Sequence, residues 1–198
     1  GLKKLIATSY QKSPIVGKGL SVDSIEGLKP SGKEPYAIEI NEVPDHNNKG
    51  AIDISDVEYL LKKKANTARS LQGDDIYGGG DFRSSACVEL LKQADIVITN
   101  PPFSLFREFV AQLVAHDKLF LIVGSKNAIT YKDIFKLVKE GKLWLGHGFA
   151  NGNAFFSTPK EYAREFAAGV YDEKTGLVKF RNVGWFTNMD HSRRHEEL

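Results

Sequence analysis

The 198-residue sequence predicts an α/β fold with a doubly wound, mostly parallel sheet, and three observations support this fold class. Residues 96–98 form a short, β-branched apolar run that two prolines soon follow, as expected of a buried strand. An amphipathic segment with helical spacing covers residues 104–115. A second apolar run at 118–123 leads into another helical pattern at 131–140. Strands that alternate with helices in this way favour a parallel sheet with helices on both faces.

The composition is that of an ordinary globular protein, so residues 1–198 are expected to form one domain. Hydrophobic residues make up 41% and charged residues 26%, and the net charge of +2 tolerates a polyanionic partner without demonstrating one. The five histidines lack ligand spacing, which predicts no metal. A single cysteine, and a sequence in which neither a signal peptide nor a membrane-length apolar run is recognised, predict a cytoplasmic protein without membrane contact.

The amino-terminal part is predicted to begin with a strand at residues 2–10. Residues 20–26 and 36–43 alternate enough to form a hairpin across the turn at 29–33. We therefore expect a small β-hairpin insertion within residues 11–50. Two interpretations of this insertion stay open, because it would serve equally as a surface against DNA or as a decoration without function.

Two helices are expected next, at residues 53–68 and 85–93. The second helix carries Cys87 on its apolar side, where packing is favoured over catalysis. Between the helices, the glycine run at 78–80 has no apolar strand before it, so we interpret it as a flexible loop.

The carboxyl-terminal part contributes a short strand at residues 143–145 and a last strand at 177–187, which is expected to be antiparallel to its neighbour. The intervening residues 146–159 are rich in Gly and Asn and carry three phenylalanines, as is typical of a wide loop.

The corner formed by Asn100, Pro101, Pro102 and Phe103 carries the chemistry of this sequence. It follows a predicted strand and precedes a predicted helix, and ligands of open α/β folds bind at this edge of the sheet. An Asn oxygen and a main-chain carbonyl fixed by the next proline could each accept one hydrogen of a planar amine, such as the amino group of adenine. An aromatic side chain could stack on the base that carries this amine. The alternative is structural, because Asn at a helix N-cap and Pro at the first helical position are both favoured. That alternative explains neither the second proline nor the phenylalanine.

A resemblance to a known family extends over most of the chain from residue 2. The segments that carry it are residues 80–84, 90–95, 100–109, 126–132 and 180–188. They resemble the EcoRI-type adenine-specific DNA methyltransferases. The resemblance implies a Rossmann-like methyltransferase fold, S-adenosylmethionine as cofactor, and methylation of adenine N6 in duplex DNA within restriction-modification.

The same resemblance assigns roles to the corner and to a second pair of residues. Asn100 and the Pro101 carbonyl would orient the amine, Pro102 would stiffen the corner, and Phe103 would stack on the flipped base. Asp81 and Phe82 would hold the adenine of the cofactor. For Asp81, a second interpretation is a cap on the following helix.

Lys126 and Asn127 are candidates for contact with the flipped base or its phosphate. Ser125 or Asn127 could instead cap the helix at 131–140. Residues 146–159 correspond to the loop that helps to clamp the target base in amino methyltransferases.

The sequence departs from the family before residue 1, where the segment that holds the methionine end of the cofactor is expected. We therefore interpret the chain as a fragment that lacks this motif. Two other functions stay open: methylation of another acceptor, such as an RNA base or a protein glutamine, and binding without catalysis. A cognate restriction endonuclease of the same system is expected to act without direct contact.

Overall fold

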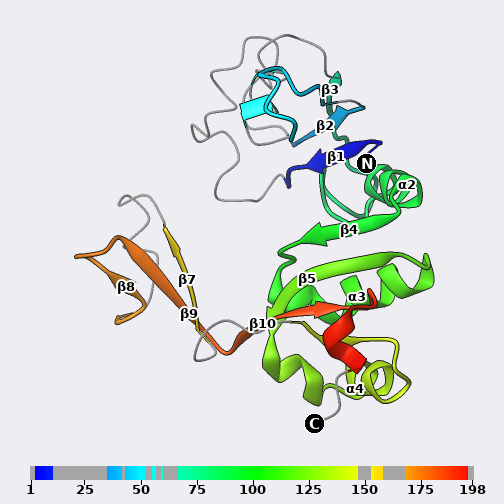
Figure 1. Ribbon diagram of the computed structural model, residues 1–198. Coiled ribbons are helices and arrows are strands. Elements are labelled where there is room, and N and C mark those ends of the chain that lie inside the picture. Colours follow the sequence, from blue (N-terminus) through cyan, green and yellow to red (C-terminus); the bar gives the residue numbers. More distant parts are fainter. Residues whose placement is uncertain are drawn as a thin grey trace. The chain divides into compact units, whose positions relative to one another are not determined.

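The computed structural model forms two compact units, Gly1–Ala94 and Asp95–Leu198, and each is described by itself (Figure 1). The structure describes residues 3–10, 35–41, 43–51, 55–56, 59, 67–146, 153–157 and 168–195.

The first unit contains a three-stranded antiparallel sheet in the order β1-β2-β3. Its strands are β1 (Leu5–Thr8), β2 (Tyr36–Ile40) and β3 (Thr67–Ser70). The strand predicted at residues 2–10 is confirmed over β1, which pairs with β2 in the register Leu5↔Ile40. The predicted strand at 36–43 is confirmed over β2, whereas its predicted hairpin partner at 20–26 lies outside the described residues.

The helix predicted over residues 53–68 is only partly described, since residues 55, 56 and 59 are helical. Its predicted end is wrong, because residues 67 and 68 already belong to β3 and pair with β2. A β-branched threonine has a higher strand than helix propensity, so pairing with the edge of β2 is favoured over another helical turn.

Helix α2 (Ser85–Gln93) agrees with its predicted bounds. Leu90 packs with Ala37 of β2 and with Leu71, and Cys87 lies against this cluster. Packing is therefore the role of the thiol in the structure, and burial raises its pKa. The small core ties α2 to the sheet of the first unit.

The second unit is built on a four-stranded sheet in the order β4-β5-β10-β6, with β4 (Ile96–Thr99), β5 (Leu119–Ser125), β6 (Trp144–Leu145) and β10 (Val183–Thr187). Strands β4 and β5 are parallel, and β10 is antiparallel to β5 and β6, as expected of the last strand. Asn188 extends the β10–β5 ladder, because its amide bonds Phe120 N at 2.8 Å and Lys118 O at 2.9 Å.

Helix α3 (Phe106–Ala115) buries Phe106, Phe109, Val110 and Leu113. The prediction placed its start at residue 104, but residues 103–105 form the 3-10 helix η2 (Phe103–Leu105). After β5 come the 3-10 helix η3 (Lys126–Thr130) and α4 (Lys132–Lys139), which buries Ile134.

Strand β4 is less buried than its sequence predicts. Ile96 is 49% exposed and Ile98 is 68% exposed. Within the described part of the chain, β4 pairs with β5 alone and is therefore an edge strand, which explains the difference.

The predicted last strand at 177–187 is broken into two strands. Asn182 adopts a left-handed backbone with φ of 56°, and the chain changes sheets there. The first part is β9 (Leu177–Arg181), which lies between β7 (Asn153–Ser157) and β8 (Tyr171–Asp172) in a second, antiparallel sheet. Residues 146–159 were predicted as a loop, so the strand β7 corrects that prediction.

We call the three strands β7, β9 and β8 the ribbon (Figure 1). Ala154 of β7 packs with Val123 and Val183, which fixes the ribbon to the four-stranded sheet. The described chain closes with the 3-10 helix η6 (Ser192–His195), where the Arg194 guanidinium stacks on Trp144 at 3.9 Å.

Candidate active site

The corner after β4 leaves its polar side chain at the surface. Asn100 and Pro102 are exposed, whereas Pro101 is buried. The Pro102 carbonyl accepts a hydrogen bond of 3.0 Å that closes the turn of η2. The ring of Phe103 is 38% exposed. The corner therefore combines a fixed backbone with an amide and an aromatic ring that solvent reaches.

The structure does not support the capping alternative for Asn100. The N-cap of η2 is Pro102 and that of α3 is Leu105, and neither helix has a side-chain cap. Within the described part of the chain, the Asn100 side chain makes no hydrogen bond. An exposed amide without a structural partner is available to a ligand.

Lys126 and Asn127 lie at the end of β5. Ser125 caps η3, since its hydroxyl accepts a hydrogen bond from Asn127 N at 3.3 Å. The helix α4 has no side-chain cap, so the prediction that Ser125 or Asn127 caps it is wrong.

A second contact joins this turn to the break between β9 and β10. The Asn127 side-chain oxygen accepts from Asn182 Nδ2 at 2.6 Å, and Lys126 N donates to Asn182 O at 2.8 Å. The Lys126 side chain extends over Gly184, where an added Cβ would meet Lys126 Cε at 3.2 Å. Asn127 thus positions its neighbour, while the Lys126 ammonium forms no ion pair within the described residues.

Asp81 is buried in the first unit and is held by Arg83. Its carboxylate accepts three hydrogen bonds from Arg83: from the backbone N at 3.0 Å, from Nε at 3.0 Å and from Nη2 at 2.9 Å. The hydrogen bond from the Arg83 side chain is the main cause that holds the pKa of Asp81 below its usual value. Two carboxylate oxygens offer about four acceptor positions. One acceptor position is therefore left for a donor other than Arg83.

The aromatic neighbours of this pair extend the arrangement. The Arg83 guanidinium lies 4.5 Å from the centre of the Tyr77 ring and 5.3 Å from that of the Phe82 ring. Neither Arg83 nor Tyr77 was singled out from the sequence. The alternation of a carboxylate and a guanidinium at positions 81 and 83 was the available signal.

Ser84, not Asp81, caps α2. Its hydroxyl accepts from Cys87 N and donates to Asp81 O at 2.7 Å. The capping interpretation of the Asp81 side chain is therefore wrong, and its carboxylate forms an ion pair with Arg83 instead.

The glycine-rich loop before Asp81 has hydrogen bonds at its start, and Gly79 within it is buried. Asp74 organises it by accepting backbone hydrogen bonds from Ile76 at 3.0 Å, Tyr77 at 2.7 Å and Ser85 at 2.8 Å. These bonds lower the pKa of Asp74.

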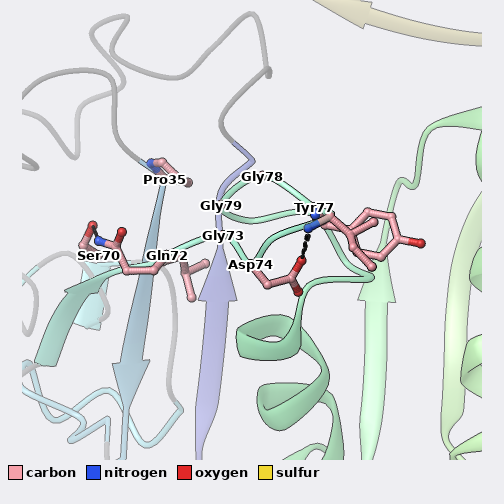
Figure 2. A pocket seen from close by; sticks show the side chains of 10 residues that line it. Pro35, Ser70, Gln72, Gly73, Asp74, Tyr77, Gly78 and Gly79 are labelled. Atoms are coloured by element: carbon pink, nitrogen blue, oxygen red, sulfur yellow. Dashed lines mark hydrogen bonds between the residues drawn. The ribbon is translucent and has the colours of Figure 1, made fainter.

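A cavity of about 410 Å³ opens beside this loop (Figure 2). Its lining comes from Pro35, Ser70, Leu71, Gln72, Gly73, Asp74, Ile76, Tyr77, Gly78 and Gly79. Figure 2 shows the Asp74 carboxylate bonded to the backbone of Tyr77 at the rim. This cavity belongs to the first unit, which also contains Asp81 and Phe82. Residues 100–103, 126 and 127 belong to the second unit.

Neither a metal-binding cluster nor a membrane-spanning helix occurs among the described residues. No group of three or more His, Cys, Asp or Glu side chains there could hold a metal ion. Among the same residues, no helix has the length and apolar character needed to cross a membrane.

Comparison with known proteins places the chain in a family. The chain is 46% identical over 122 residues to the Type II methyltransferase M.EcoRI of Escherichia coli, a match that covers 61% of this chain and 37% of the relative. It is 43% identical over 115 residues to the Type II methyltransferase M.MpnI of Mycoplasma pneumoniae, covering 57% of this chain and 36% of the relative.

The chain thus spans little more than a third of the curated relatives it matches. No solved structure matches it significantly. The family model described as adenine-specific methyltransferase EcoRI matches residues 1–198. The chain therefore belongs to the EcoRI family of adenine-specific methyltransferases.

Proposed function

We propose that the protein is a site-specific DNA methyltransferase of a restriction-modification system, which methylates N6 of a flipped adenine in duplex DNA with S-adenosylmethionine. Membership in the family and the printed names of the relatives as Type II methyltransferases support the reaction class. The cognate endonuclease would act on the same DNA sequence without binding this protein.

The observation that carries the proposal is the exposed Asn100 amide. This residue directly follows β4, caps neither η2 nor α3, and its side chain forms no hydrogen bond with a described residue. Asn100 follows a parallel strand at the edge of the sheet where ligands of open α/β folds bind, and a buried proline fixes the backbone next to it.

The corner would act on the amine of adenine, whose lone pair is conjugated into the ring. The Asn100 side-chain oxygen and the Pro101 carbonyl would each accept one amine hydrogen, which favours the pyramidal nitrogen of the transition state. Pro102 keeps the backbone of the corner fixed, and the Phe103 ring would stack on the flipped base. When bound, S-adenosylmethionine supplies an electrophilic methyl group.

Asp81 and Phe82 would hold the adenine of that cofactor. The ionised Asp81 carboxylate keeps one acceptor position for the adenine amine, and Phe82 is partly exposed beside it. Lys126 would contact the phosphate next to the flipped base, and Asn127 would hold the turn that carries Lys126.

We further propose the finer features of the architecture. Residues 1–198 would form one methyltransferase domain with a doubly wound sheet, and residues 11–50 would be an insertion in it. Because β2 pairs with β1 on one side and with β3 on the other, residues 20–26 are not its hairpin partner. The cytoplasm is the compartment we propose, since a lone cysteine packed into a core fits a reducing environment.

Substitution of Asn100 tests the function. In the full-length protein, Asn100→Ala should lower methyl transfer to duplex DNA at least about a hundredfold. Its affinity for S-adenosylmethionine, measured by calorimetry, should stay unchanged. Asn41→Ala, at an exposed position after β2, is the matched control and should keep full activity. Unchanged turnover of Asn100→Ala would remove the corner from the mechanism, and transfer to RNA or protein instead of DNA would replace the proposed substrate.

A further inference from the structure

The strand register of the second unit brings the ends of β4 and β5 and the start of β10 to one edge of its sheet. Thr99 of β4 lies beside Ile122 of β5, and Ser125 of β5 lies beside Val183 of β10. Neighbouring strands are about 4.8 Å apart and a strand rises about 3.3 Å per residue, so the end of β4 and the start of β10 are offset by about 10 Å across the sheet and by about 10 Å along β5. The candidate corner and the base of the ribbon therefore share the carboxyl edge of β4 and β5.

Four cations gather along this edge and the ribbon. Arg107 lies in the first turn of α3, Lys126 follows β5, and Lys179 and Arg181 belong to β9. Within the described part of the chain, none of the four forms an ion pair.

Two other cations of the same unit are paired with carboxylates. Lys142 pairs with Glu140 at 2.9 Å, and Arg194 pairs with Asp190 at 3.4 Å. These pairs lie away from the corner, beyond the carboxyl-terminal end of α4 and near η6. Cations that are left without carboxylates at one edge are suited to a polyanion.

Aromatic rings hold two of the four cations in place. The Arg107 guanidinium lies 5.3 Å from the centre of the Tyr131 ring, and Lys179 Nζ lies 5.8 Å from that of Phe155. A cation stacked on a ring keeps most of its hydrogen-bond donors free. Both groups are thus pre-oriented for an acceptor from outside the chain.

The ribbon presents one face with mixed chemistry. Phe155 lies opposite Lys179, and Asn153 lies opposite Arg181, so the four side chains share a face. The Phe155 ring is 56% exposed, whereas Ala154, on the other face, packs on the main sheet. The end of the ribbon that carries these four side chains is built from β7 and β9, because β8 is in register only with Leu177 and Val178. A pair of strands has the width that the major groove of DNA admits.

We propose that Arg107, Lys126, Lys179 and Arg181 form a track for the phosphate backbone of duplex DNA, with the ribbon face of Phe155 turned to the duplex. This proposal rests on the proposed function and names the surface that holds its substrate. The track ends before the β8–β9 turn, where Asp172 and Glu173 would repel phosphate.

Salt dependence of DNA binding tests the track, because each phosphate contact contributes about 0.9 to the slope of log Kd against log salt. The probe is a 30-base-pair duplex of random sequence, and the protein is full-length. Arg107→Gln and Arg181→Gln should each lower the slope by about 0.9, and the double variant by about 1.8. Arg181→Lys keeps the charge and should keep the slope.

Lys139→Gln is the matched control. Lys139 is exposed, forms no ion pair with a described residue and lies in the last turn of α4, which leads away from the carboxyl edge. Its substitution should leave the slope unchanged. If the two arginine variants keep the wild-type slope while the wild type methylates DNA, the track is wrong and the proposed function stands. An equal loss for Lys139→Gln would also overturn the track, because net charge would then explain binding. A wild type that neither binds nor methylates duplex DNA would overturn the function itself.

Discussion

The ring of Phe106 packs directly against Gly124, so that a methyl group at Gly124 would overlap the ring and meet its Cζ atom at 2.9 Å. Phe106 is the first residue of α3 and is 2% exposed, and its ring meets that of Phe186 edge to face at 4.9 Å. The contact joins the start of the helix after Phe103 to the end of β5. It therefore fixes the candidate corner relative to the edge of the sheet.

Gly124→Ala should disturb both stability and catalysis. The added methyl group forces the Phe106 ring to move, and overpacking of this kind costs about 1–3 kcal/mol of unfolding free energy. Because η2 precedes α3 directly, we expect methyl transfer to fall as well. Urea denaturation and a methyl-transfer assay measure the two effects.

A second substitution separates overpacking from other causes. Phe106→Leu in the Gly124→Ala background removes the overlapping ring atoms and should restore part of the activity. If Gly124→Ala alone unfolds at the wild-type urea concentration, the contact does not constrain the corner.

The sequence predicted the helices α2, α3 and α4 well, because their periodicity is strong. The bounds of α2 were correct, and α3 and α4 begin within two residues of their predicted starts. The position of the exposed amide at Asn100 also followed from two prolines that end a strand. These features depend on short-range chemistry.

The errors come from contacts that are distant in sequence. Asparagine tolerates a left-handed backbone, but the sequence does not place a break at Asn182, because the bond from Asn182 to Asn127 spans 55 residues. Residues 67 and 68 join β3 because β2 offers them an edge. The capping role assigned to Asp81 failed for a different reason, since Arg83 competes for the same carboxylate.

Gly80→Ala should be more damaging than Gly50→Ala, although both glycines have a left-handed backbone, with φ of 74° and 79°. An alanine there costs about 1–2 kcal/mol from the backbone alone. At Gly80 the methyl group would also overlap the main chain of Ser9 and lie 2.9 Å from Tyr10 Cα, whereas Gly50 has open space. Chemical denaturation should show a loss at Gly80 that exceeds the loss at Gly50. Equal losses would mean that the packing of the glycine-rich loop on the residues after β1 is not maintained in solution.

Because of the ion pair of Asp81 and Arg83, the free energy of unfolding should depend on pH in the acidic range. The Asp81 pKa is held below its usual value of 3.8 in the fold, chiefly by the hydrogen bond from Arg83. A carboxyl group whose pKa is lower in the folded than in the unfolded protein stabilises the fold fully at pH values above its unfolded-state pKa. This stabilisation is lost as the pH falls through its folded-state pKa. The contribution is therefore complete at neutral pH and disappears in acid.

Asp81→Asn should lower the free energy of unfolding by about 1.5–3 kcal/mol at pH 7, the range for hydrogen bonds to charged groups. Because the amide does not titrate, the difference from the wild type should shrink as pH falls below about 4. Asp75→Asn, at an exposed position of the same loop, should leave unfolding unchanged at neutral and acidic pH. Urea titrations at pH 7 and at successively lower pH measure the difference. A difference between wild type and Asp81→Asn that stays constant into acid would show that the carboxylate is not held ionised by Arg83.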